Sequence, residues 1–392
     1  MFNVLYIKAA TAYDGPYRNV IDKFIERYKI LGPLTACVSH TPDWNGPQMF
    51  VRPDGVTITF VEKENTVKKR FFARSENKKK VYGLVEKADI VIGHVPDSVA
   101  SMALLRACKL KKTCIAVVVG CAWDALWNYG WKGKLMAPIS FFNMRRTLRE
   151  VPHAIYVTER FLQHRYPCLG ETLACSNVEL MPFDESVLSR RLGKIESEPQ
   201  KTSVKIVTTA TIDVPFKNQE DVIAAMSELK KRGAGKEIHY YLIGPGDKTR
   251  LASVARHYGL ENNVHFLGKK SHEDVFAILD SADIYVQPSR LEGMPRAVVE
   301  AMGRALPVIG TRVGGIPELL PVSRLYAPGD VRSLARIIES LTPEVMAGDA
   351  RRNFAKAGEY ASDVLNARRN AFLEHVAQYA AAMKDGGHSG EA

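Results

Sequence analysis

The sequence predicts an α/β protein built from two domains, each with a central parallel sheet. Three observations support this prediction. The chain has 392 residues, which is long for a single hydrophobic core. In both halves, short apolar runs alternate with helical patterns, as they do in βα units. Between the halves, residues 184–203 are polar and lack a hydrophobic period, which is typical of a linker.

The first half begins with a buried strand and continues with alternating strands and helices. The strand at 114–119 consists of small and β-branched residues, so we expect it in the centre of the sheet. Residues 49–61 resemble a hairpin, because Pro53, Asp54 and Gly55 favour a turn. The other predicted strands lie at 1–7, 35–38, 89–94 and 154–157, with helices beginning at 16, 98 and 159.

The loop after the central strand, residues 120–134, holds three of the chain's four tryptophans. Sites of α/β proteins form at the carboxyl ends of strands, and aromatic faces stack on sugar rings. We therefore interpret this loop as a platform for a sugar acceptor, while an aromatic packing loop is the alternative. The platform residues are Trp123, Asp124, Trp127, Asn128 and Trp131.

Two residues of the first half are candidates for a base on the acceptor side. His94 ends the predicted strand at 89–94, and Asp124 lies in the tryptophan loop. Either side chain would accept a proton from an acceptor hydroxyl if it lay within hydrogen-bond reach. For a single histidine, packing inside a loop is the alternative interpretation.

The second half repeats the βα pattern from a strand at 204–211 onward. A Gly-x-Gly turn, Gly244 to Gly246, follows the apolar residues 239–243, and the last long helical pattern covers 349–383. The sequence therefore divides into a domain at 1–185, a linker at 186–203, a domain at 204–365, and a C-terminal helix and tail at 366–392.

Residues 289–302 contain the most informative motif of the chain. Pro295 suits the first turn of a helix, because its missing N–H is one of the donors that this turn leaves unpaired. Glu292 then lies in the loop before the helix and Glu300 on the helix itself, with amides and the positive helix end between them. This arrangement suits a nucleotide-sugar, because backbone amides can bind its diphosphate and carboxylates can accept hydrogen bonds from its hydroxyl groups. In isolation, two solvated glutamates on an ordinary strand–loop–helix would explain the same pair.

This motif resembles the Glu-x7-Glu region of retaining family 4 glycosyltransferases of the GT-B fold, and residues 303–318 continue the similarity. The resemblance implies two Rossmann-like α/β/α domains that face a central cleft, with a final helix crossing back to the first domain. Residues 123–127, 154–162 and 165–167 resemble, more loosely, the acceptor domain of bacterial polysaccharide-assembly glycosyltransferases. We therefore expect transfer of a sugar from a nucleotide diphosphate to a glycan or lipid-linked acceptor, with retention at the anomeric carbon.

The resemblance also implies roles for individual residues on the donor side. Glu300 would bind the ribose and Glu292 the donor sugar, while Lys217 stands where the family has a phosphate-binding lysine. The family's arginine five places before that lysine is replaced by Ile212, and Arg290 and Arg296 are the nearby cations that would compensate. The remaining donor residues are Gly244, Gly246, Leu267, Gly268 and Lys269, with Gly293, Met294 and Pro295 presenting amides to phosphate.

The first loop departs from the family pattern. Relatives usually carry a glycine-rich turn after the first strand, whereas residues 8–12 here are Lys-Ala-Ala-Thr-Ala and only Gly15 remains. Either the backbone does not approach the donor at this loop, or the acceptor takes that space.

The net charge of +11 indicates an anionic partner. The densest basic run, residues 68–80, includes two adjacent aromatic residues, as an anionic membrane patch would, and a solvated face is the alternative. No recognition motif for nucleic acid is present, and the six cysteines and ten histidines show no metal-site spacing, so we expect neither nucleic acid nor a metal or cofactor. The absence of a leader or spanning run predicts a cytoplasmic protein, and the basic run would allow it to bind the inner face of the plasma membrane.

Alternative functions of three classes remain open. A sugar-nucleotide epimerase or a phosphorylase would use the same two-domain architecture, the first without an acceptor and the second with inorganic phosphate. A noncatalytic nucleotide-sugar-binding relative would keep the fold but tolerate loss of Glu292. A basic RNA- or membrane-binding protein would show binding that weakens with salt and would not bind nucleotide-sugars.

Overall fold

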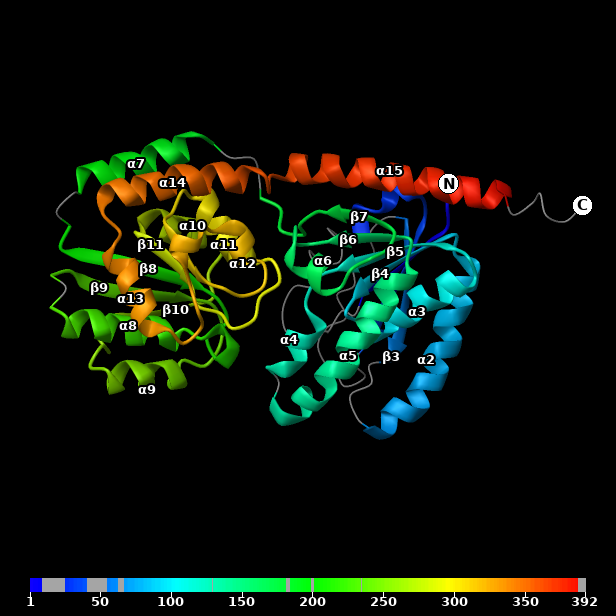
Figure 1. Cartoon of the computed structure of the whole chain (residues 1–392), viewed down its shortest axis with the longest axis horizontal. Coiled ribbons are helices and arrows are strands. Elements are labelled where there is room, and N and C mark those ends of the chain that lie inside the picture. Colours follow the sequence, from blue (N-terminus) through cyan, green and yellow to red (C-terminus); the bar gives the residue numbers. More distant parts are fainter. Residues whose placement is uncertain are drawn as a thin grey trace, which may run out of the picture. The chain divides into compact units, whose positions relative to one another are not determined.

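The computed structural model describes residues 1–8, 25–40, 55–62, 67–128, 130–180, 184–198, 201–233 and 235–386 (Figure 1). The chain divides into two compact units, Met1–Cys175 with Asn366–Ala392, and Ser176–Leu365. Each unit contains one parallel sheet with helices packed on it. The predicted α/β fold with two sheets is therefore confirmed.

The sheet of the first unit has the strand order β3-β2-β1-β4-β5-β6-β7, and all described pairs are parallel. Every residue of β4 and β5 is buried, which explains their continuous apolar sequences. The strands are β1 Val4–Lys8, β2 Leu34–His40, β3 Val56–Glu62, β4 Ile90–Val95, β5 Thr113–Val118, β6 His153–Tyr156 and β7 Glu171–Ala174.

The hairpin expected at 49–61 stays a prediction, because only one of its two arms is described. β3 pairs in parallel with β2, with Val56 opposite Leu34, and parallel neighbours need a long connection rather than a tight turn. Residues 49–54, which would form the other arm, lie outside the described residues.

Helices of the first unit include α15 (Ser362–Gly386), which belongs to this unit from Asn366 onward. It is fixed by a 2.8 Å contact from His375 Nε2 to the Glu171 carboxylate and by a 2.8 Å ion pair from Lys384 Nζ to Asp89. The others are α2 Val67–Lys87, α3 Ser98–Lys109, α4 Ala122–Trp127, α5 Gly130–Glu150 and α6 Phe161–Arg165. The helix predicted to begin at residue 16 lies largely outside the described residues.

The sheet of the second unit has the order β10-β9-β8-β11-β12-β13 and is also parallel in every described pair. Its core includes Ile206 and Val286 from the two central strands, both fully buried. The strands are β8 Ser203–Thr209, β9 Glu237–Ile243, β10 Val264–Gly268, β11 Ile284–Gln287, β12 Val308–Thr311 and β13 Leu325–Tyr326.

The helices of the second unit are α7 Ser186–Ser197, α8 Glu220–Lys231, α9 Thr249–His257, α10 His272–Ser281, α11 Arg296–Gly303, α12 Ile316–Leu319, α13 Val331–Glu339 and α14 Pro343–Gly358. The long helical pattern expected at 349–383 is thus divided between α14 and α15. The break falls at residues 359–361, between the ends of the two helices.

The segment 186–203, predicted to be a linker, instead contains α7 and the start of β8. The buried Arg191 of α7 donates from Nη1 to the Ala282 carbonyl (2.6 Å) and from Nη2 to the Leu279 carbonyl (2.9 Å). Val187 and Ile195 face the second unit at helical spacing. The many charged residues between them hid this period, because only one narrow stripe of the helix is apolar.

Candidate functional site

The strand order of the second sheet reverses between β8 and β11. In α/β sheets, ligands bind outside the carboxyl ends of the strands at such a switch point. The loop after β8 leads into a short 3-10 helix, η2 (Pro215–Lys217), and the loop after β11 leads into α11. These two loops carry Lys217 and Glu292, so the topology brings together two residues that are 75 positions apart in the chain.

Lys217 and Glu292 form an ion pair in which Nζ lies 2.7 Å from Oε1. Gln287 Nε2, at the end of β11, donates to the same Oε1 over 2.9 Å. Tyr285 fixes the amide of Gln287 by donating to its Oε1 (2.7 Å), and burial raises the pKa of this tyrosine well above its usual range. The Glu292 carboxylate is therefore held by a chain of fixed donors rather than by solvent.

Arg290 joins the same two loops. Its backbone N–H donates to the Phe216 carbonyl (2.7 Å), and its Nε donates to Asn218 Oδ1 (3.0 Å). Asn218 is fully buried, adopts a left-handed φ of 55° and donates back to the Pro288 carbonyl (3.1 Å). Arg290 is thus fixed to the loop that carries Lys217 through the neighbouring Asn218, and its role as a compensating cation stays a prediction.

Ile212, at the position where the family arginine was expected, is 3% exposed and belongs to the hydrophobic core of the second unit. Its backbone N–H donates to the Pro245 carbonyl over 2.9 Å. The departure from the family pattern therefore adds core packing to this loop and leaves the cations of the site to Lys217 and Arg290.

Glu300 lies on α11 and is 6% exposed. His272 Nε2 approaches its Oε1 at 3.2 Å, and Arg296 Nη1 lies 3.9 Å from the same oxygen. The helix begins at Arg296, so Pro295 is its N-cap. The sequence had predicted Pro295 inside the first turn, one position further into the helix. No side chain caps this helix start, so its first amides and the positive end of its dipole face the loop of Glu292.

Glycines allow the loops of this sheet edge to pack closely. A Cβ on Gly244 would lie 2.0 Å from the Ala210 carbonyl oxygen, and one on Gly246 would lie 2.6 Å from Asp213 Oδ1. Gly314, with a φ of 58°, would bring a Cβ to 2.0 Å from the Glu292 carbonyl oxygen. Gly314 therefore sets the position of the Glu292 loop, together with a 2.7 Å bond from the Gly315 N–H to the Gly293 carbonyl.

The remaining donor-side residues lie around this centre. Gly268 accepts from the Gly244 N–H (3.0 Å), which connects the end of the edge strand β10 to the loop after β9. Leu267 is half-buried and Lys269 is exposed beside it. Met294 accepts from Tyr360 Oη at 3.8 Å, so the loop before α11 is fixed on that side as well.

In the first unit, His94 does not have the environment of an effective base. It is 4% exposed, and its Nε2 lies 3.0 Å from Tyr6 Oη on the neighbouring strand β1. Burial, together with the charges of Lys8 and Arg27, lowers the pKa of His94 to about 3. A base with so low a pKa is poorly matched to proton transfer near neutral pH, so its catalytic role stays a prediction.

The tryptophan loop forms α4 and the start of α5. Trp123 and Trp127 stack on each other, with ring centroids 5.2 Å apart and planes at 17°, which occupies one face of each ring. The Asp124 carboxylate pairs with Arg165 Nη2 at 3.3 Å, and the Asn128 amide donates to the Asp124 carbonyl (2.8 Å). Trp131 is exposed. The sugar-platform role of these residues stays a prediction.

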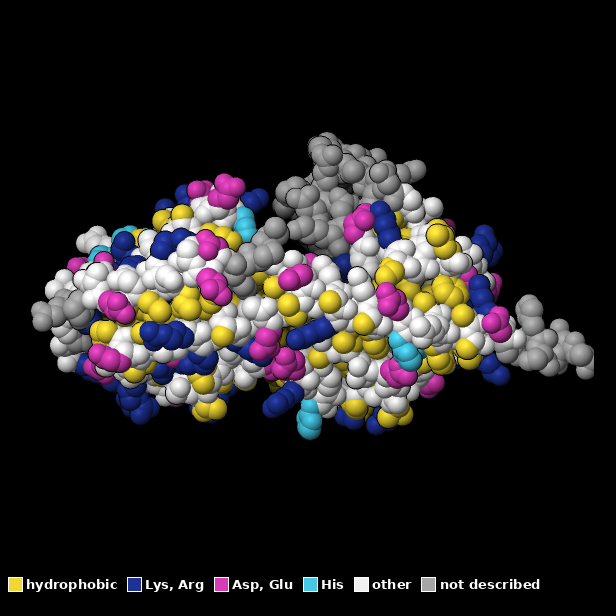
Figure 2. Space-filling model, turned by 90° about the horizontal axis from the view of Figure 1, so that it is seen from above, with side chains coloured by type: hydrophobic (Ala, Val, Ile, Leu, Met, Phe, Trp, Pro, Cys, Tyr) yellow, Lys and Arg dark blue, Asp and Glu magenta, His cyan; other side chains and the backbone are white. Residues whose placement is uncertain are grey.

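The basic run at 68–80 lies on α2, where Lys78, Lys79 and Lys80 are exposed. The side chains of residues 67–75 and all of Gly15 lie outside the described part of the chain. Figure 2 shows basic and acidic side chains interspersed over the faces that carry α7, α14 and α15. Among the described helices, none is both long and apolar enough to cross a bilayer.

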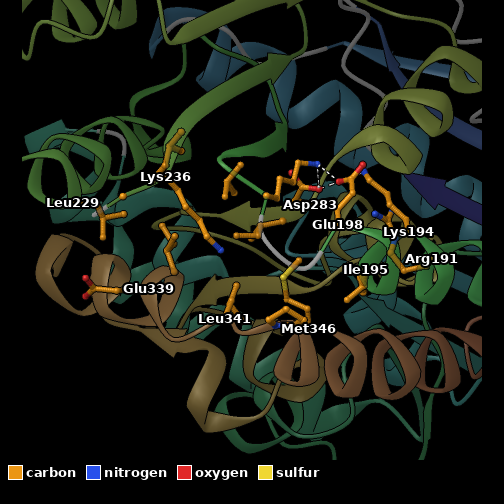
Figure 3. Close-up of a pocket in the computed structure, with 17 residues that line it drawn as sticks. Arg191, Lys194, Ile195, Glu198, Leu229, Lys236, Asp283, Glu339, Leu341 and Met346 are labelled. Atoms are coloured by element: carbon orange, nitrogen blue, oxygen red, sulfur yellow. Dashed lines mark hydrogen bonds and ion pairs between the residues drawn. The ribbon is translucent and has the colours of Figure 1, made fainter. Parts of the chain in front are cut away.

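A cavity of about 280 Å³ lies at the opposite edge of the second sheet (Figure 3). Val204, Ile238 and Ile284, near the starts of β8, β9 and β11, line it, and Lys194 and Lys201 approach Asp283 Oδ1 at 3.3 and 3.1 Å beside it. Since the cavity is at the amino ends of the strands and mostly apolar, it is separate from the Lys217–Glu292 centre.

The sequence analysis missed the residues that support the two carboxylates. Gln287 holds Glu292, Asn218 holds Arg290, and His272 approaches Glu300. A polar Gln at the end of the otherwise apolar β11 was a usable signal, because buried polar groups need partners. His272 begins α10, 28 residues before Glu300, so its contact depends on tertiary structure alone.

Comparison with known proteins finds a family match in the second unit. Residues 203–343 match the family described as glycosyl transferases group 1. The chain is 29% identical over 257 residues to protein CapJ of Staphylococcus aureus, covering 65% of this chain and 63% of CapJ. It is 32% identical over 193 residues to the amylovoran biosynthesis glycosyltransferase AmsK of Erwinia amylovora, covering 47% and 46%. The alignments thus span less than two thirds of these relatives' lengths.

Solved structures show the fold over nearly the whole chain. Sucrose-phosphate synthase of Thermosynechococcus elongatus superposes with a TM-score of 0.71 at 15% identity, covering 95% of this chain and 98% of that one. Anabaena HepE in complex with UDP gives 0.65 at 16% identity, covering 95% and 100%. The chain therefore has the GT-B fold, and its residues 203–343 match the family model for glycosyl transferases group 1.

Proposed function

We propose that this protein is a retaining glycosyltransferase that moves a sugar from a nucleoside diphosphate-sugar to a glycan or lipid-linked acceptor in bacterial cell-surface polysaccharide synthesis. The observation that carries the proposal is the Lys217–Glu292 pair at the switch point of the second sheet, next to the uncapped start of α11. The similarity to AmsK, an amylovoran biosynthesis glycosyltransferase, supports the class of product. The complexes of HepE with UDP and UDP-glucose support the class of donor.

The donor would bind across the loops of the second unit. The diphosphate lies at the amides of Gly293, Met294 and Pro295–Arg296 and at the cations of Lys217 and Arg290. Glu300 accepts from the ribose hydroxyls and Glu292 from the donor sugar. The loop of Leu267, Gly268 and Lys269 contacts the base of the nucleotide. We place the protein in the cytoplasm, where nucleotide-sugars are available.

In the proposed reaction, the bond from the anomeric carbon to the diphosphate oxygen breaks, and the acceptor oxygen bonds to that carbon on the same face. The acceptor's hydroxyl proton passes to the departing diphosphate oxygen, so no protein nucleophile is required. Negative charge grows on the diphosphate as the bond breaks, and Lys217, Arg290 and the α11 amides supply fixed positive charge there without a metal. Glu292 orients the sugar and balances the charge of the cationic anomeric carbon.

Saturation-transfer NMR with the purified protein tests the donor half of this proposal. The panel contains uridine, guanosine and adenosine diphosphates and their hexose derivatives. We expect one base to give clear transfer signals, with the sugar protons also contacting the protein. A panel in which no nucleotide binds would contradict the proposal. Conversion of the donor sugar without any acceptor would favour an epimerase of the same architecture instead.

A further inference from the structure

The helix α5 of the first unit is apolar on two opposite faces. Gly133, Ala137 and Met144 are buried and face the unit, where α5 packs against α3 and α4 (Figure 1). On the opposite face, a second set of apolar side chains recurs at three- and four-residue spacing, which is the spacing of one helix face. These residues, here called the outer stripe, are Trp131, Leu135, Ile139 and Phe142.

The outer stripe is far more exposed than apolar side chains usually are. Trp131 is 69% exposed, Leu135 67%, Ile139 53% and Phe142 67%. Trp127 of α4 is 43% exposed, and its ring lies beside Lys134 of α5, with 5.6 Å between Lys134 Nζ and the ring centre. Single exposed apolar residues are ordinary, but a contiguous exposed patch indicates an interaction surface.

Positive charge surrounds the outer stripe. The sequence of α5 contains five basic residues, at positions 132, 134, 145, 146 and 149, and one acidic residue, Glu150. Lys132 Nζ lies 5.5 Å from the centre of the Trp131 ring, and Lys134 Nζ lies 5.6 Å from that of Trp127. Tryptophan and lysine placed side by side in this way are typical of membrane interfaces, where the ring sits at headgroup depth and the ammonium remains in water.

We propose that the outer stripe docks this protein on an anionic lipid bilayer, with α5 lying in the plane of the interface. A bilayer offers apolar contact for the stripe and phosphate for the five cations in one surface. A second copy of the chain fits less well, because a two-fold contact would place the cations of one α5 opposite those of the other. The site is distinct from the nucleotide-binding loops of the second unit.

This inference assigns two of the predicted sugar-platform residues, Trp127 and Trp131, to lipid contact. It also places the membrane surface on α5 rather than on the basic run of α2. The docking goes beyond the proposed transferase activity. Lipid binding and nucleotide binding are measured in separate experiments, and either can be absent while the other is present.

Co-sedimentation with vesicles tests the proposal. One set of vesicles contains phosphatidylcholine alone, and the other contains about 30% phosphatidylglycerol. The anionic lipid gives the second set a negative surface potential that attracts basic residues. We expect the full chain to sediment with the mixed vesicles, and the double variant L135S/F142S to partition at least about tenfold less, because both side chains leave water only in the bound state. The control is L169S, since Leu169 is 77% exposed in the same unit but lies outside α5.

Three outcomes would overturn the proposal. The first is unchanged vesicle binding by L135S/F142S, and the second is loss of binding in a variant with Lys78, Lys79 and Lys80 changed to Glu while L135S/F142S still binds. The third is a wild-type dimer that dissociates in L135S/F142S without any vesicle binding. Circular dichroism of each variant verifies folding, and the nucleotide panel, run on L135S/F142S, shows whether donor binding is independent.

Discussion

The two sheets of this chain reverse their strand order in the same way, yet their switch points carry different chemistry. In the first unit the reversal falls between β1 and β4, where Tyr6 and His94 meet at 3.0 Å. Both are buried; burial lowers the pKa of His94 to about 3 and raises the pKa of Tyr6 well above its usual range. This pair is therefore neutral at physiological pH. In the second unit the reversal falls between β8 and β11, where Lys217 and Glu292 form a partly exposed ion pair.

Strand order therefore determines where in a sheet a site can form, but not which chemical groups the site contains. A switch point offers space at the carboxyl ends of two strands in both sheets. In the second unit, loop glycines, an uncapped helix start and paired charges meet there, whereas in the first unit the loop after β1 lies outside the described residues. A charged ligand such as a diphosphate would be bound by that set, whereas the described pair of the first unit is buried and neutral.

The largest effect is expected from Glu292→Gln. The amide keeps the shape of the side chain but removes the charge beside Lys217, so we expect kcat to fall about 100-fold or more while nucleotide affinity changes less. Steady-state kinetics with the donor found in the nucleotide panel measures this. His94→Gln is the partner substitution in the first unit, and we expect kcat within tenfold of wild type. An equal loss in both variants would break the comparison between the two switch points.

A smaller effect is expected from Gly314→Ala, compared with Gly259→Ala. Both glycines have a left-handed φ, 58° and 63°, so both substitutions carry a similar backbone cost of about 1 kcal/mol. Only at Gly314 does the new Cβ meet the Glu292 carbonyl, at 2.0 Å, whereas nothing lies within 4 Å at Gly259.

We expect Gly314→Ala to lose turnover by about 10- to 100-fold, because the Glu292 loop must move. Thermal unfolding and kinetics on both variants measure stability and turnover in parallel. Equal turnover in the two variants would show that the position of this loop does not matter for catalysis.

The smallest effect concerns the pH dependence of stability in the first unit. His94 has a folded pKa of about 3, below the 6.5 of an unfolded histidine, so the unfolded chain takes up the proton first as the pH falls. The free energy of unfolding should therefore decrease between pH 6.5 and 3, and His94→Gln should flatten this decrease.

Tryptophan fluorescence during denaturant unfolding follows this effect, since all four tryptophans, at positions 44, 123, 127 and 131, belong to the first unit. His164→Gln, at an exposed position on α6, should keep the wild-type slope. A His94→Gln variant with the wild-type slope would show that this histidine is not the buried neutral group described above.

Much of the second unit was predictable from its sequence, because local patterns determine it. The apolar strand before residue 288 and the helix from Arg296 predict both the loop of Glu292 and the helical position of Glu300. The pairing of Lys217 with Glu292 was not predictable from spacing, since it depends on the order in which β8 and β11 join the sheet.

The errors in the prediction have physical causes as well. The helix α7 was not predicted, because its four charged residues are as numerous as its four apolar ones and interrupt the apolar stripe. Trp131, at the start of α5, was interpreted as part of a loop, because Gly130 and Gly133 are ordinarily poor helix residues. Pro138 is nevertheless inside the helix, where tertiary packing outweighs its local preference.

Calorimetric titration of the nucleotide identified by the panel tests the central claim most directly, with two variants of the second unit compared. Glu300→Ala removes the carboxylate at the carboxyl edge of the sheet, and Glu339→Ala removes one beside the cavity at the amino edge. The account predicts that Glu300→Ala weakens binding by about 10- to 100-fold, the effect of losing a hydrogen bond to a charged group. It also predicts wild-type affinity for Glu339→Ala. Undiminished binding in Glu300→Ala, or a loss in Glu339→Ala alone, would contradict the placement of the site.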